Sequence, residues 1–168
     1  EQVREHFPIP KAPQVKIRVG DGRAVLDGTR EGSFDVIVRD AFASGVTPDH
    51  LRTVECADQV RRALTASGVY LVNCAHGGPA NARQDVAALQ DVFPFVASIQ
   101  DPKVGRGGRR GNVVALASAA DVVDVDQIDR VLRMLALPAR ITRPAELTRW
   151  VAGTPTLTDA LVGYPQAD

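Results

Sequence analysis

Residues 69–74 (VYLVNC) form an almost unbroken apolar run, and this run constrains the fold more than any other segment. A short run of this kind is typical of a strand buried on both faces, as in a parallel sheet that helices cover. Residues 34–40 are rich in β-branched side chains and predict another strand. Between the two, apolar residues recur at helical spacing over 51–64, with Thr47-Pro48 as the expected helix start and Gly68 as its end. This order of strand, helix and strand indicates an α/β fold with a parallel sheet.

The rest of the chain continues the alternation and ends in an antiparallel pair. Phe95–Ile99 and Val113–Ala117 predict two strands, and the loop 101–111 between them leaves no room for a helix, so we expect a hairpin. Val15–Val19 alternates apolar and basic residues and predicts one more strand. The expected helices are a helix end at 1–7, a short piece at 24–26, longer helices at 81–92 and 124–137, and one or two turns at 144–151. The predicted fold class is therefore α/β, with a mostly parallel sheet and a final antiparallel hairpin.

Composition excludes several classes of protein without selecting one. The chain has 168 residues, and its 20 basic and 20 acidic residues balance, which argues against a nucleic-acid partner because such proteins carry a basic surface. No apolar run approaches the roughly 20 residues that span a bilayer, so we expect no membrane partner. Two cysteines cannot form a disulfide framework, and they favour a reducing compartment, which we take to be the cytoplasm.

Several conspicuous residues predict packing rather than chemistry. The three histidines are scattered without the spacing of metal ligands, so we expect no metal. Cys56 on a helix and Cys74 in a strand predict buried, inert thiols, and Trp150 predicts packing against the sheet. The glycines of 105–111 are spaced almost as in a dinucleotide-binding motif, but that motif opens a helix and here a strand follows.

Two carboxylates fall where the ligand of such a sheet binds. In open α/β sheets the ligand lies outside the carboxyl ends of the strands, and Asp21 and Asp40 each follow a predicted strand. Asp21, between Gly20 and Gly22, could accept a hydrogen bond from an amino group such as that of adenine, or it could serve only the geometry of a tight turn. Asp40 is expected to be partly desolvated, which makes it a candidate base or cation partner; the alternative is a carboxylate that caps the amides of its own loop.

Three arginines lie in the predicted hairpin loop, namely Arg106, Arg109 and Arg110. Among so many glycines they could form a clamp for an anion. The other interpretation, a solvated hairpin loop, remains open.

The order of these motifs resembles the spermidine synthase family, and most closely the spermidine synthase-like proteins of high-GC actinobacteria. The resemblance rests on Gly20-Asp21-Gly22-Arg23, on FDVIVRDAF at 34–42, on the Pro-Asp-His-Leu segment at 48–51, on SGVYLVN at 67–73 and on RRGNVV at 109–114. It covers residues 1–118 in unbroken order. Each motif is only moderately specific, whereas the ordered set is considerably stronger.

The resemblance implies a fold, a reaction and roles for individual residues. The fold is the Rossmann-like class I methyltransferase fold, and the reaction moves an aminopropyl group from decarboxylated S-adenosylmethionine to an amine, without a metal. By position, Asp21 and Gly22 match the adenine contacts and Ala41 lies with them on the cofactor side. Asp40 matches the catalytic carboxylate that orients or deprotonates the attacking amine. The implied partner is a small-molecule amine or another small acceptor, and a homodimer stays open.

Three departures from the family pattern change what we expect. Ala43 stands where the family has a second Asp that holds the far amine, and Arg109 and Arg110 stand where it commonly supplies a Tyr. Losing a carboxylate and gaining cations both disfavour a diamine, so we expect an acceptor other than putrescine. The glycine-rich loop and the ribose-binding acid of the family have no counterpart in the chain, so we expect a sheet without its first strands and an incomplete cofactor site.

These observations predict two regions and three functions. Residues 1–137 are expected to be the C-terminal part of a spermidine synthase-like Rossmann domain, and 138–168 an extension with a short helix and a loose tail. The leading function is an aminopropyltransferase in polyamine biosynthesis. The alternatives are a methyltransferase that uses S-adenosylmethionine on a small anionic acceptor, favoured by the loop arginines, and a noncatalytic relative, favoured by Ala43.

Overall fold

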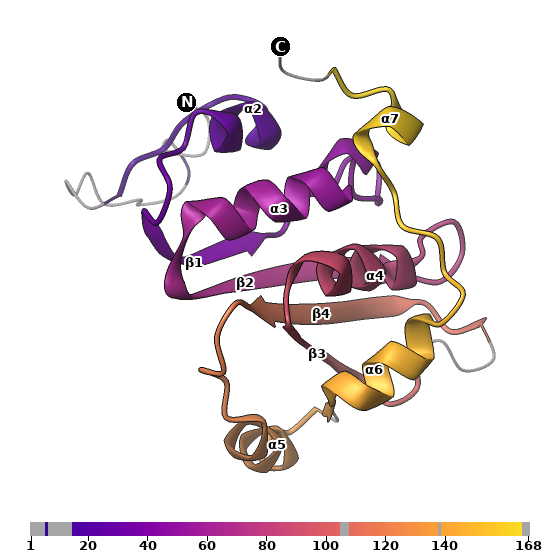
Figure 1. The fold of residues 1–168 in the computed structure, drawn as a ribbon. Coiled ribbons are helices and arrows are strands. Elements are labelled where there is room, and N and C mark those ends of the chain that lie inside the picture. Colours follow the sequence, from indigo (N-terminus) through magenta and orange to yellow (C-terminus); the bar gives the residue numbers. More distant parts are fainter. Residues whose placement is uncertain (1–5, 7–14, 105–107, 138, 166–168) are drawn as a thin grey trace.

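The computed structural model describes residue 6 and residues 15–104, 108–137 and 139–165. Its centre is one five-stranded sheet with helices on both faces (Figure 1). The strands are β1 (Phe34–Arg39), β2 (Leu64–His76), β3 (Phe95–Gln100), β4 (Gly111–Ser118) and β5 (Arg140–Thr142). The helices are α2 (Gly22–Asp27), the short 3-10 helix η1 (Asp49–Leu51), α3 (Val54–Ala63), α4 (Ala82–Val92), α5 (Val125–Arg133), α6 (Pro144–Val151) and α7 (Asp159–Val162). The predicted α/β class is confirmed.

The sheet is mixed, in the order β1-β2-β4-β3-β5. β1 and β2 pair in parallel, whereas β4 is antiparallel to both β2 and β3, and β5 is antiparallel to β3. β1, β2 and β3 therefore run one way and end at the same edge. The predicted β3–β4 hairpin is confirmed, and β5, which pairs over only three residues, is an addition that no sequence pattern predicted.

The strand expected at Val15–Val19 does not form. This segment has no regular secondary structure, and its apolar side chains are exposed, Val19 completely. β1 pairs with β2 on one side, and among the described residues nothing pairs with its other edge. Alternation alone cannot form a strand, because the backbone groups need a neighbouring strand to bond. The helix end expected at 1–7 lies outside the described residues except for His6.

Several helix boundaries differ from the prediction. Thr47-Pro48 leads only into η1, and α3 begins at Val54, where the hydroxyl of Thr53 caps it by accepting a hydrogen bond from the backbone N–H of Cys56. α3 ends at Ala63 rather than at Gly68, which lies inside β2, and α5 ends at Arg133 rather than at 137. Local capping chemistry explains the first difference, because Thr53 offers the same type of cap as Thr47, six residues further along.

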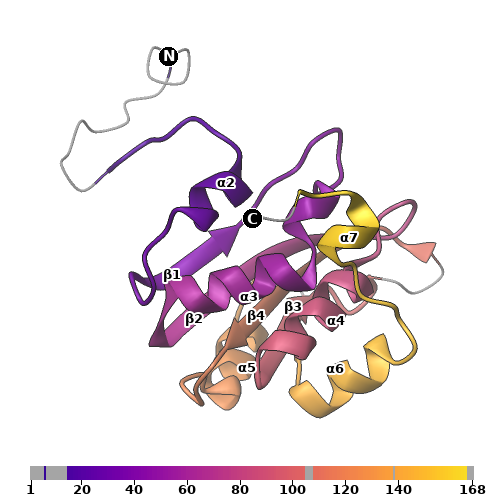
Figure 2. The ribbon, with the colours of Figure 1, turned by 45° about the horizontal axis from the view of Figure 1, so that its top comes forward.

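The core lies mainly between the sheet and one helical layer. α3, α4 and α6 cover one face, and their side chains pack with Tyr70, Val72 and Cys74 of β2. α5 covers the opposite face only at the β3–β5 end, where Leu132 packs with Ala97 and Ile141 (Figure 2). β2 is consequently buried on one face and half-buried on the other, not buried on both as predicted.

Candidate functional site

Asp40 lies beside Asn73, just beyond the carboxyl end of β1. Arg39 pairs with Val72 in the parallel register, so Asp40, the first residue after β1, comes level with Asn73, which lies three residues before the end of β2. There the Asn73 amide nitrogen donates a hydrogen bond to Asp40 Oδ1 over 3.0 Å. This bond fixes one oxygen of the carboxylate and leaves the other free to meet a proton or a cation.

Asp40 is exposed, which contradicts the expectation of partial desolvation. β1 is an edge strand among the described residues, and Val36 and Val38 on the same strand are 54% and 63% exposed. The loop after Asp40 turns back at once: Ala43 and Val46 exchange two backbone hydrogen bonds of 2.8 and 3.1 Å. Ser44 and Gly45 both have positive φ in this turn, 52° and 81°, the pattern of a type I′ turn.

Asp21 caps helix α2 and also bonds a histidine from another segment. Its Oδ1 accepts hydrogen bonds from the backbone N–H groups of Arg23 (2.9 Å) and Ala24 (3.1 Å), and its Oδ2 lies 2.9 Å from His50 Nε2. The His50 hydrogen bond is the main cause that lowers the pKa of Asp21, so the carboxylate is ionised. Asp21 therefore does serve the local backbone geometry, as one of the two interpretations expects. Its carboxylate is also half-exposed and keeps lone pairs that can accept a hydrogen bond from a ligand.

Gly22 and Ala41 each follow one of the two candidate carboxylates, Asp21 and Asp40, directly in the chain. A Cβ on Gly22 would meet only Leu51, at an ordinary 3.9 Å, so packing within the chain does not require a glycine there. Ala41 is half-buried and follows Asp40 directly.

The C-terminal segment packs against the residues around Asp21 through a buried polar network. Arg23 is 1% exposed, and its guanidinium donates to both oxygens of Asp159 in α7 (3.2 and 2.8 Å). Thr53 donates to the same carboxylate over 2.6 Å. The Tyr164 ring, just after α7, stacks on the His50 ring with centroids 5.5 Å apart. Figure 2 shows α7 close to α3. A segment more than a hundred residues away thus supports the histidine that holds Asp21, and no motif in the sequence pointed to it.

A second buried network lies beneath the loop that follows Asp40. Arg39 and Arg52 both bond the carboxylate of Asp85 in α4, which is 4% exposed. Arg39 also donates to the carbonyl of Leu51 over 2.8 Å. Burial is the largest single effect and by itself would lower the pKa of both arginines. The charge of Asp85, its hydrogen bonds and the other nearby groups together outweigh it and raise the pKa of both, so both stay protonated. The network joins β1, η1 and α4 and so fixes the start and end of the loop 40–48.

The two candidate acceptor arginines separate in the structure. Arg110 lines a cavity of about 430 Å³ together with Ser44, Gly45 and His76. Its side chain passes Gly78 so closely that a Cβ there would lie 2.8 Å from Arg110 Nε. Arg109 is half-exposed and lies 3.6 Å from Asp101 instead. Arg106 lies outside the described residues.

Among the described residues, no three or more His, Cys, Asp or Glu side chains gather in a way that could hold a metal ion. None of the described helices is both long and apolar enough to cross a membrane.

Comparison with solved structures identifies the fold. A probable spermidine synthase from Corynebacterium glutamicum superposes with a TM-score of 0.84 at 32% sequence identity; the match covers 94% of this chain and 59% of that one. A spermidine synthase in complex with the transition state analogue AdoDATO gives a TM-score of 0.54 at 16% identity, covering 91% of this chain and 52% of that one. Human methyltransferase-like protein 13, in complex with SAH, gives 0.57 at 14% identity, covering 94% and 69%.

No protein-family model matches the chain, and no curated protein does either. The chain spans a little over half the length of the spermidine synthases that it matches. The two likenesses below 25% identity concern the fold alone. The sheet order, the final hairpin and the likeness at 32% identity agree, and the chain therefore has the spermidine synthase-like form of the class I methyltransferase-like fold.

Proposed function

We propose that the protein is an aminopropyltransferase of the spermidine synthase type, with an amine other than putrescine as acceptor. The observation that carries this proposal is the hydrogen bond between Asn73 and Asp40 at the carboxyl edge of a spermidine synthase-like sheet. In such a transfer the acceptor nitrogen attacks the methylene carbon of the aminopropyl group. The carbon–sulfur bond breaks, its electron pair stays on sulfur, and methylthioadenosine leaves.

In this proposal Asp40 orients the attacking amine and takes the proton that it loses. A carboxylate held by one hydrogen bond and open on its other oxygen suits this role. Asp21, ionised and half-exposed, accepts the amino group of adenine, with Gly22 and Ala41 as neighbouring contacts. These roles fit a co-substrate of the decarboxylated S-adenosylmethionine class, and the solved relatives in complex with AdoDATO and SAH support that class.

The acceptor side supports a less cationic amine than a diamine. Ala43 has no carboxylate, and its backbone is occupied by the turn with Val46. Arg110 adds a cation to the cavity behind that turn. At an effective dielectric of about 20, one pair of unit charges at 4 Å is worth about 4 kcal/mol, which is enough to decide between substrates.

Arg110 also supports the alternative, a methyltransferase on a small anionic acceptor. The product distinguishes the two reactions: aminopropyl transfer releases methylthioadenosine, whereas methyl transfer releases S-adenosylhomocysteine. A noncatalytic relative would release neither.

Both cysteines are free and buried, which fits the reducing cytoplasm in which we place this polyamine chemistry.

The test is release of methylthioadenosine by the full-length protein with a panel of amines. Asp40→Asn keeps the hydrogen-bonding shape but cannot take a proton, so we expect a loss of at least about a hundredfold, the usual scale of general base catalysis. Asp35→Asn, an exposed carboxylate on the same strand, is the matched control and keeps full activity. Undiminished release by Asp40→Asn removes that residue from the mechanism.

A further inference from the structure

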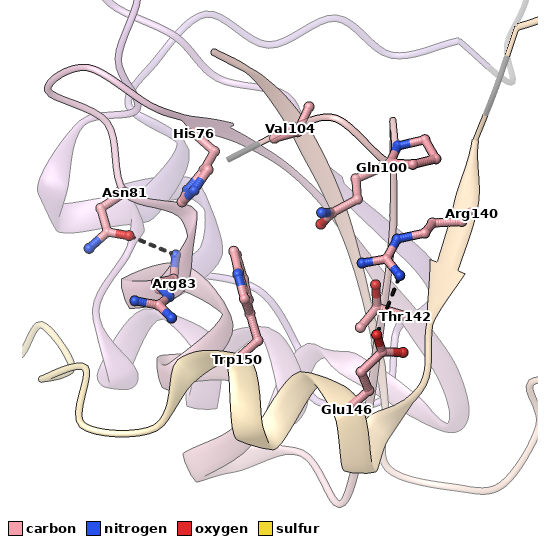
Figure 3. A pocket seen from close by; sticks show the side chains of 10 residues that line it. His76, Asn81, Arg83, Gln100, Val104, Arg140, Thr142, Glu146 and Trp150 are labelled. Atoms are coloured by element: carbon pink, nitrogen blue, oxygen red, sulfur yellow. Dashed lines mark hydrogen bonds and ion pairs between the residues drawn. The ribbon is translucent and has the colours of Figure 1, made fainter. Parts of the chain in front are cut away.

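A cavity of about 500 Å³ lies between α4, α6 and β5, next to the carboxyl ends of β2 and β3 (Figure 3). Neither Asp21 nor Asp40 lines it, and the proposed transfer reaction gives it no role. Its size is in the range of cavities that take small organic ligands.

One wall of this cavity is aromatic and basic. His76, at the end of β2, and Trp150 of α6 lie with ring centroids 5.4 Å apart. The guanidinium of Arg83 in α4 lies 5.5 Å from the centroid of the Trp150 ring. Figure 3 shows these three side chains together on one side of the cavity.

The opposite wall is polar. Arg140 and Thr142 come from β5, and Glu146 comes from α6 (Figure 3). Arg140 pairs with Glu146 over 3.4 Å, and Thr142 is 4% exposed. Two arginines against one carboxylate leave the cavity with a net positive charge.

The hydrogen-bonding groups of the cavity are incompletely used. Among all described residues, nine buried side-chain polar atoms have no hydrogen-bond partner. Four of the nine belong to side chains that line this cavity: His76 Nδ1, Arg83 Nε, Arg140 Nε and Thr142 Oγ1. A buried polar atom without a partner is costly, and four of them gather beside this one cavity. These atoms are themselves inaccessible to a water-sized molecule, so the groups that a ligand can reach are the other polar atoms of the same side chains.

We propose that this cavity binds a small organic anion, with a carboxylate or phosphate recognised by Arg83 and Arg140 and a flat apolar body against Trp150. Guanidinium groups suit both kinds of anion, because their donors match the paired oxygens of either. The hydroxyl of Thr142 supplies a further donor from the polar wall. This cavity shares His76 with the cavity that Arg110 lines, but neither Asp21 nor Asp40 lines it, and the proposal does not depend on the transfer reaction.

Trp150 is the only tryptophan of the chain, so its fluorescence reports on this cavity directly. The probes are benzoate and phenyl phosphate, which carry the same ring on the two anionic groups, and neutral benzamide as the comparison. We expect a saturable change in Trp150 emission with at least one anion and none with benzamide at the same concentration. The tighter anion identifies the class of ligand. No saturable response to either anion, or an equal response to benzamide, overturns the proposal.

Substitution then tests the two arginines, with affinities measured by calorimetry. Arg83→Gln and Arg140→Gln each remove a charge-assisted partner and should weaken the anion about tenfold or more. Arg149→Gln, an exposed arginine beside Trp150 that does not line the cavity, is the matched control and should bind as the parent does. Arg140→Lys keeps the charge without the guanidinium and should lose less than Arg140→Gln. Equal weakening by Arg149→Gln contradicts recognition by these two side chains.

Discussion

Replacement of Asp159 by Ala should lower the free energy of unfolding more than replacement of a charged residue on the surface does. The Asp159 carboxylate accepts two hydrogen bonds from Arg23, at 3.2 and 2.8 Å, and one from Thr53, at 2.6 Å. Without it the Arg23 guanidinium stays buried, because the side chain is almost entirely inaccessible. Breaking a buried pair by removing one partner costs about 3–5 kcal/mol. Arg23 keeps its hydrogen bond to the carbonyl of His50, so we expect the lower end, about 3 kcal/mol.

Urea denaturation measures this loss as a lower midpoint at an unchanged slope. On the usual scale for a chain of this size, the melting temperature should fall by about 6–12 °C. The double variant Arg23→Met/Asp159→Ala should recover part of the stability, since it removes a buried charge that keeps, among the described residues, only its longer ion pair with Asp27, at 3.7 Å. Asp129→Ala, which breaks a helical ion pair with the exposed Arg133, is the control and should cost no more than about 0.5 kcal/mol. A loss below about 1 kcal/mol for Asp159→Ala would refute the buried network as the element that holds the C-terminal segment.

Three further results are expected. Asn73→Ala should lower transfer activity while leaving nucleoside affinity unchanged, because among the described residues Asn73 alone donates a hydrogen bond to the side chain of Asp40, the proposed catalytic carboxylate; a parallel loss of affinity would contradict this. Cys56 and Cys74 should resist thiol reagents until the protein unfolds, since burial raises the pKa of both and that of Cys74 to about 12; rapid labelling of the native protein would show otherwise. Burial, and then the charge of Arg83, lower the pKa of His76 from its usual value of about 6.5. The protein should therefore lose stability as the pH falls from that value through the lowered pKa of the folded state, because the unfolded chain takes up the proton first. An NMR titration should also show the pKa of His76 rising in Arg83→Gln, and no rise would exclude the charge effect.

The sequence predicted those parts of the fold that local chemistry decides. β1, β2, α4, the β3–β4 hairpin and α6 follow from apolar periodicity and from caps such as Asn81. Val15–Val19 failed because a strand needs a partner, which periodicity cannot supply. β5 escaped prediction because three residues carry no period, and it forms only because β3 offers it an edge.

The candidate site was predictable only where a residue stands at the end of a strand. Asp40 was found by that rule and does follow β1. Asp21 was selected by the same rule, but Val15–Val19 is not a strand, and Asp21 is placed by its cap of α2 instead. Their partners His50 and Asn73 were not predicted, because the contacts span 29 and 33 residues and depend on packing. Trp150 was expected to pack, and its position in the wall of a cavity depends on side chains from four other elements, β2, α4, β3 and β5.

The central claim is that the edge formed by the ends of β1 and β2, with Asp21 beside it, is a nucleoside site. Calorimetric titration of the full-length protein with methylthioadenosine tests it most directly. We expect saturable binding that Asp21→Asn weakens about tenfold, while the helix α2 persists because Asn caps as well as Asp does. Asp27→Asn, at the other end of the same helix, should bind as the parent does. Failure to bind methylthioadenosine or S-adenosylhomocysteine would contradict the account and favour a noncatalytic relative.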